Sequence, residues 1–187
     1  QAQSKYAITL YKQIFAAFGE IKFLNTTRSP WSYFVSLYFQ LMEIRVRAGA
    51  PIIGPKQYFE AQHEFLQEKP ELSIFWAYKN WSSKELFSKF LNISQEEIYI
   101  INYEELKTCE SITNLLSSKC NIQFKKDISS QIDPIFKSKS YKETKSNRLK
   151  SKMISEIAAH EGINHETVVE YLKQWMSKRF EHLDLFA

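Results

Sequence analysis

Two short runs of apolar and β-branched residues constrain the fold of this chain more than any other feature. One run is IKFLNTT at residues 21–27, and the other is EIYIINY at residues 97–103. Each has the length and composition of a buried β-strand, and each leads into a helical pattern. The residues between the two runs have helical patterns. A long helical crossover therefore joins the strands, as parallel pairing requires. The sequence therefore predicts an α/β fold, a parallel sheet flanked by helices.

Helices account for most of the remaining sequence. Apolar periodicity predicts them at residues 6–18, 30–47, 56–67, 72–81, 84–91, 104–120, 148–159 and 164–180. Ser29 and Ser83 stand at N-cap positions, and Pro30 takes the first helical position. The last two helices form a C-terminal hairpin. We assign residues 1–145 to the α/β portion, with a polar loop at 127–145, and residues 146–187 to the hairpin packed on the same domain.

Composition excludes several classes of protein. With 187 residues, 44% of them hydrophobic and 15% aromatic, the chain can bury a core and is not disordered. The net charge is +4, and the positive charges are scattered except at residues 137–152, so no nucleic-acid-binding face is expected. No apolar run approaches the roughly 20 residues of a membrane span. Two cysteines without a CxxC motif indicate packing thiols in a reducing, cytoplasmic environment.

Glycine is scarce, and its scarcity excludes the glycine-rich loops that commonly bind nucleotides. Only four glycines occur, and neither GxxxxGK[ST] nor GxGxxG is present. The chain therefore cannot hold a nucleotide by itself through a complete P-loop or dinucleotide loop. Two of the glycines and two of the five prolines fall within RAGAPIIGPK at residues 47–56. Loops of this kind often carry function, so this one is a candidate for lining a site.

The most informative stretch is FLNTTRSPWSYFVSLY at residues 23–38. Arg28 follows the first strand and Ser36 lies two turns into the next helix, so both should face the carboxyl edge of the sheet, where open α/β folds bind ligands. Arg28 could hold a phosphate through two hydrogen bonds, with Ser36 donating another. Alternatively, Arg28 caps the strand or pairs with a carboxylate, and Ser36 is a small residue in a helix contact.

Thr27-Arg28-Ser29-Pro30, with Ser36 eight residues after the arginine, resembles the 3′-phosphate motif of the sulfotransferases that use phosphoadenosine phosphosulfate (PAPS). A second stretch, IYIINYEEL at residues 98–106, is similar to a later strand and turn of that family. The likeness covers roughly residues 5–125. It implies a sulfotransferase fold in which Arg28 and Ser36 bind the 3′-phosphate and Tyr103 approaches the adenine.

The resemblance also implies the chemistry. A sulfuryl group would pass from PAPS to a hydroxyl or amine on a small-molecule or carbohydrate acceptor, leaving adenosine 3′,5′-bisphosphate (PAP), with no metal required. The family's phosphosulfate loop is absent, so we expect this chain to be the C-terminal portion, with an N-terminal segment of the same protein supplying that loop. The catalytic base is unassigned, since Glu20 is the only carboxylate in residues 1–27 and fits a solvated turn.

Other functions remain as alternatives. The chain could be a noncatalytic binding or interaction module that kept the sulfotransferase-like scaffold. Residues 155–175 have the spacing of a helix-turn-helix, but Glu166 and Glu170 on its second helix disfavour contact with phosphate. His160 and His165 are five residues apart, whereas a zinc-protease helix places its histidines four apart, so metal binding is also disfavoured.

Overall fold

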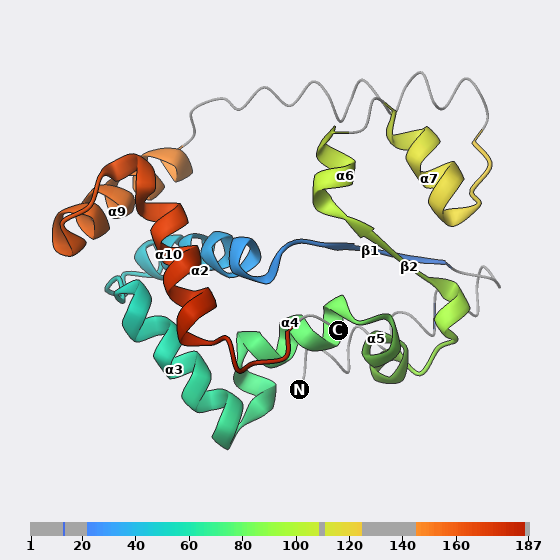
Figure 1. Cartoon of the computed structure of the whole chain (residues 1–187), viewed down its shortest axis with the longest axis horizontal. Coiled ribbons are helices and arrows are strands. Elements are labelled where there is room, and N and C mark those ends of the chain that lie inside the picture. The colour runs from blue at the N-terminus through green and yellow to red at the C-terminus, as the bar shows by residue number, and fades with distance from the viewer. Residues whose placement is uncertain (1–12, 14–21, 109–110, 125–144, 186–187) are drawn as a thin grey trace. The chain divides into compact units, whose positions relative to one another are not determined.

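The structure is a computed structural model that describes residue 13 and residues 22–108, 111–124 and 145–185 (Figure 1). The chain forms two compact units. The first, here called the sheet unit, comprises Gln1–Thr27 and Lys79–Asp133, and the second, the helical unit, comprises Arg28–Tyr78 and Pro134–Ala187. Apart from residue 13, the helix predicted at 6–18 lies outside the described residues, as does the polar loop up to residue 144. The assignment of 1–145 and 146–187 as separate portions stays a prediction.

The sheet unit contains the two predicted strands, which pair in parallel. Strand β1 (Phe23–Thr27) lies beside β2 (Ile98–Asn102), in a register that runs from Phe23 opposite Ile98 to Thr27 opposite Asn102 (Figure 1). The described part of the chain is otherwise helix-rich, so the α/β class is confirmed at this coarse level.

The expectation that β1 is a buried strand is wrong for one of its faces. Successive side chains of a strand point to opposite faces of the sheet. Along β1 they alternate between half-buried and exposed, and Leu24 is 44% exposed. The opposite face is packed, because the ring of Phe23 meets that of Phe87 edge-on at a centroid distance of 6.3 Å.

A short helix covers the packed face. Helix α5 (Lys84–Leu91) begins at Ser83, whose side chain accepts a hydrogen bond from the backbone N–H of Leu86, as the predicted cap requires. Phe87 on this helix is buried against Ile98 of β2. The helix ends at Asn92, which has a left-handed backbone (φ 56°), and the 3₁₀ helix η2 (Gln95–Glu97) leads into β2.

The single helix predicted at residues 104–120 is wrong, because the structure breaks it in two. Helix α6 (Tyr103–Thr108) follows β2, and α7 (Ile112–Cys120) begins again after Ser111, whose side chain accepts from the N–H of Asn114. A serine that can cap competes with helix continuation, which accounts for the break. Cys120 is fully buried with a free thiol, as expected of a packing cysteine, whereas Cys109 lies outside the described residues.

The helical unit is built around one long aromatic helix. Helix α2 (Pro30–Arg47) starts with proline at its first position, as predicted, although Ser29 makes no side-chain cap hydrogen bond. It is followed by α3 (Pro55–Glu68), the 3₁₀ helix η1 (Pro70–Leu72) and α4 (Ile74–Ser82), whose last residues continue into the sheet unit. The ring of Phe34 on α2 lies 4.9 Å from that of Phe75, and Phe75 lies 5.1 Å from Phe180.

The predicted C-terminal hairpin is present in the same unit. Helix α9 (Lys145–Glu161) turns at Gly162, where φ is 65°, and leads through η3 (His165–Thr167) into α10 (Val168–Arg179). Glycine adopts this left-handed conformation without steric cost. Both helices pack against α2, where Met153, Val168, Leu172 and Met176 are buried. Within the described residues, no helix is both long and apolar enough to cross a membrane.

Replacing Phe34 tests the central place of α2. Phe34 is fully buried, so Phe34→Ala should lower the free energy of unfolding by roughly 3 to 5 kcal/mol, the usual cost of a large aromatic cavity. Urea unfolding followed by circular dichroism measures this change. Phe65→Ala on α3 is the matched control, because Phe65 is 37% exposed and should cost much less. Equal losses for the two variants would contradict this account of the core.

Candidate functional site

Two of the sequence-predicted site residues directly follow the strands. Arg28 comes after β1 and Tyr103 after β2, and the strands end on the paired residues Thr27 and Asn102. Tyr103 is the first residue of α6 and is 36% exposed. It belongs to the sheet unit, whereas Arg28 belongs to the helical unit. The strand-to-helix boundary expected at each residue is therefore present.

Arg28 and Ser36 both lie in the helical unit, at the entrance to α2 and within it. Ser36 is two turns into the helix, which places it about 10 Å along the helix axis from Ser29. Both Arg28 and Ser36 are half-buried. The backbone of Arg28 is held in place, because its carbonyl accepts a hydrogen bond from the Tyr78 hydroxyl on α4.

A pocket of about 450 Å³ opens elsewhere in the helical unit. One side is the loop before α3 and the first turn of that helix, contributed by Ile52 and by residues 54–57, and Tyr38 of α2 forms a further wall. The loop that stood out in the sequence for its glycine and proline content therefore does line a pocket. None of Arg28, Ser36 and Tyr103 lines it.

The other side of the pocket is one face of α9. Its lining residues, Met153, Glu156, Ile157, His160 and Glu161, are spaced three or four apart or adjacent, as residues on one face of a helix are. Met153 and Ile157 are buried, while the acidic residues and His160 supply the polar groups.

Tyr38 closes the apolar end of this pocket. Its hydroxyl donates a 2.7 Å hydrogen bond to the carbonyl of Ile53, so the phenol is fixed against the loop. Burial, with a smaller contribution from the charge of Glu156, raises the pKa of Tyr38 well above its ordinary value. The Tyr38 phenol therefore stays neutral at physiological pH. Its electrostatic interaction with Glu156 indicates that the Glu156 carboxylate faces this part of the pocket.

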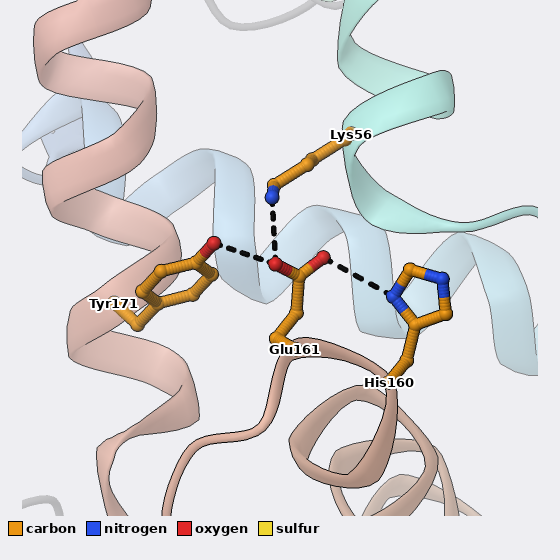
Figure 2. A network of polar contacts seen from close by, with 4 residues as sticks. All are labelled: Lys56, His160, Glu161 and Tyr171. Atoms are coloured by element: carbon orange, nitrogen blue, oxygen red, sulfur yellow. Dashed lines mark hydrogen bonds and ion pairs between the residues drawn. The ribbon is translucent and has the colours of Figure 1, made fainter.

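Glu161 ties three helices together at the edge of the pocket, as Figure 2 shows. Lys56 Nζ of α3 donates to Glu161 Oε2 at 2.6 Å, and the Tyr171 hydroxyl of α10 donates to the same oxygen at 2.6 Å. His160 Nδ1 lies 3.3 Å from the other oxygen, Oε1. The Glu161 side chain is only 13% exposed, so its charge is largely removed from water and compensated by these partners.

The electrostatics of this cluster favour a fixed ion pair. The hydrogen bond from Lys56, and then that from Tyr171, lower the pKa of Glu161, and the same contact with Glu161 raises the pKa of Lys56. Both groups are thus charged at neutral pH. A carboxylate with a lowered pKa is a poor general base, so the arrangement holds structure and does not supply acid–base catalysis.

Sequence reasoning missed this cluster. Lys56 and Glu161 are 105 residues apart, and no local pattern relates them. His160 did stand out in the sequence, but together with His165 as a possible metal motif. In the structure, His160 is 84% exposed and contacts Glu161, and no group of three metal-ligating side chains occurs among the described residues.

Comparisons with protein-family models, with curated proteins and with solved structures find no match to this chain.

Glu161→Gln tests the ion pair through its pH dependence. A carboxyl whose pKa is lowered by folding stabilises the folded state above its unfolded pKa, near 4.5, and this stabilisation is lost as the pH falls below that value. At pH 7 the variant should be less stable by roughly 1 to 2 kcal/mol. At pH 3 the difference from the original protein should shrink, as urea unfolding at both pH values would show.

The control is Glu170→Gln, which removes an exposed carboxylate of α10 paired with Lys173. It should change stability little at either pH, because exposed ion pairs contribute little. A Glu161→Gln effect that does not change between pH 7 and pH 3 would argue against the charged pair.

Proposed function

We propose that this chain is a sulfotransferase, or the C-terminal portion of one, that binds PAPS through Arg28 and Ser36 and acts on a hydroxyl or amine acceptor. The observation that carries the proposal is the place of the motif in the structure. Thr27-Arg28-Ser29-Pro30 spans the boundary between β1 and α2, and Ser36 lies two turns into that helix. This is the strand-to-helix setting that the resemblance to the 3′-phosphate motif of sulfotransferases requires.

The second motif supports the same proposal. β2 runs parallel to β1 in the order that the resemblance implies, and Tyr103 begins the helix that follows it. In a sulfotransferase fold the carboxyl ends of parallel strands form the nucleotide edge. Tyr103 is 36% exposed, and the resemblance assigns its ring to the adenine.

Arg28 is suited to the proposed phosphate contact. A guanidinium presents planar donors that match two phosphate oxygens, and the half-buried position of Arg28 limits screening by solvent. The bond from Tyr78 to the Arg28 carbonyl fixes the backbone from which this side chain extends. Ser36 would add a hydroxyl donor to the same phosphate.

PAPS would supply the sulfuryl group. In the transfer, an acceptor oxygen or nitrogen bonds to sulfur while the bond from sulfur to the 5′-phosphate oxygen breaks, and PAP leaves. The acceptor's proton passes to a base for which we assign no residue. Arg28 and Ser36 would contribute by holding the 3′-phosphate and so positioning the nucleotide for the transfer.

Binding to PAP tests the proposal. We expect weak binding, in the micromolar range or above, because the sequence contains no phosphosulfate loop to hold the 5′ end. Arg28→Lys keeps the charge but loses the planar donors, so it should weaken PAP binding roughly tenfold to hundredfold. Adenosine 5′-phosphate, which lacks the 3′-phosphate, should bind both proteins almost equally. Titrations followed by NMR reach the affinities required.

Arg47→Lys is the matched control, because Arg47 lies at the far end of α2, where it pairs with Glu43. It should bind PAP as the original protein does. Equal losses for PAP and adenosine 5′-phosphate in Arg28→Lys would mean that Arg28 supports the fold and does not recognise the 3′-phosphate. PAP binding without sulfuryl transfer from PAPS, in a protein that also carries a phosphosulfate loop, would instead favour the noncatalytic module.

A further inference from the structure

We propose that the pocket between α3 and α9 binds a small molecule with an apolar body and one protonated amine, and that the amine pairs with Glu156. The proposal does not depend on the sulfotransferase assignment. The volume of about 450 Å³ lies within the range of small-molecule sites in proteins, about 300 to 1,000 Å³. All of its lining residues belong to the helical unit, so the pocket is complete within that one unit.

The apolar residues that line the pocket determine which apolar group a ligand can carry. The apolar lining comes from three segments, with Ile52 from the loop, Ile157 and the almost fully buried Met153 from α9, and the fully buried Tyr38 from α2. Methionine is flexible and polarisable, so Met153 can adjust to ligands of different shape. A flat ring system of one or two rings fits such walls, because its faces can contact the loop on one side and α9 on the other.

The charged residues that line the pocket determine which polar group a ligand can carry. Lys56 is engaged by Glu161 at 2.6 Å, and it also lies 5.4 Å from the ring centroid of Tyr171 and 6.0 Å from that of Trp175. The positive charge of Lys56 is thus already offset. Glu161 is likewise satisfied, because both of its oxygens have partners.

Among the charged residues that line the pocket, Glu156 has the longer and more exposed ion pair, so a ligand's amine can replace its partner. Glu156 forms an ion pair with Lys152 one turn earlier on α9, with Lys152 Nζ 3.8 Å from its Oε1; both side chains are exposed, so the pair is weak. The side chain of Glu156 is 54% exposed, so a ligand can reach it. The N-terminus of α3 adds partial positive charge on the opposite wall, which places the ligand's amine on the α9 side and its apolar body toward α3.

This pocket is distinct from the proposed nucleotide contacts. Ser36 and Tyr38 are both on α2 but only two residues apart, and residues at that spacing project from different sides of a helix. Tyr38 faces the pocket, so Ser36 does not. Ligand binding here should therefore leave the Arg28 position unaffected.

Three probes with the same indole ring test the proposal: tryptamine, the neutral alcohol tryptophol, and indole-3-propionate. We expect tryptamine to bind roughly threefold to tenfold more tightly than tryptophol, and indole-3-propionate to bind most weakly. NMR titration measures all three affinities, and the methyl signals of Met153 and Ile157 should shift with each bound probe.

Glu156→Gln keeps the size of the side chain and removes its charge, so it should abolish the preference for the amine. Glu166→Gln, an exposed carboxylate of the same hairpin outside the pocket, should retain the preference, and Arg28→Lys should bind all three probes as the original protein does. Ile52→Trp should fill the pocket from the loop and weaken all three probes, with circular dichroism confirming that the variant is folded.

Each other outcome would overturn the proposal. Equal affinities for the three probes would mean that Glu156 does not select charge. Tighter binding of the carboxylate would mean that Lys56 and the start of α3 dominate the pocket. No binding of tryptamine at millimolar concentration, or binding that Glu156→Gln leaves unchanged, would place the ligand site elsewhere or exclude it.

Discussion

Burial of the aromatic face of α2 is the constraint on which the rest of the helical unit depends. Phe34, Tyr38 and Phe39 cannot be exposed to water together without a large loss of hydrophobic stabilisation, so helices from later parts of the chain must cover them. α4 in the middle of the chain supplies Phe75, and the C-terminal hairpin α9–α10 also packs on α2. The pocket and the Glu161 cluster both lie where α9 meets α3.

Local signals in the sequence predicted most of the described elements. Pro30 at the first position of α2, the cap at Ser83 and the left-handed Gly162 are each readable from a few neighbouring residues, and each is present. The break between α6 and α7 was missed because Ser111 reads equally well as a residue inside a helix. Its role as a cap depends on the backbone adopting an extended conformation there.

The site was harder to predict than the fold, for a physical reason. Arg28 and Ser36 could be proposed because their spacing along a strand and a helix is itself local. Lys56, Glu161 and Tyr171 come together only when α3, α9 and α10 pack, and packing between helices leaves no short motif in the sequence. Of the pocket, only the loop before α3 was recognisable beforehand, through its glycines and prolines.

The scarcity of glycine has a consequence for the ends of the helices. Left-handed backbone is needed at Asn92 and Asn121 as well as at Gly49 and Gly162, and the chain uses asparagine at two of these four described positions. Asparagine tolerates this conformation but has fewer unfolded conformations than glycine. At these helix ends, asparagine therefore adds some local strain to the folded chain, but the chain also loses less conformational entropy when it folds. A change from asparagine to glycine at either position would relieve the backbone strain at the helix end. It would also raise the conformational entropy of the unfolded chain and so favour unfolding.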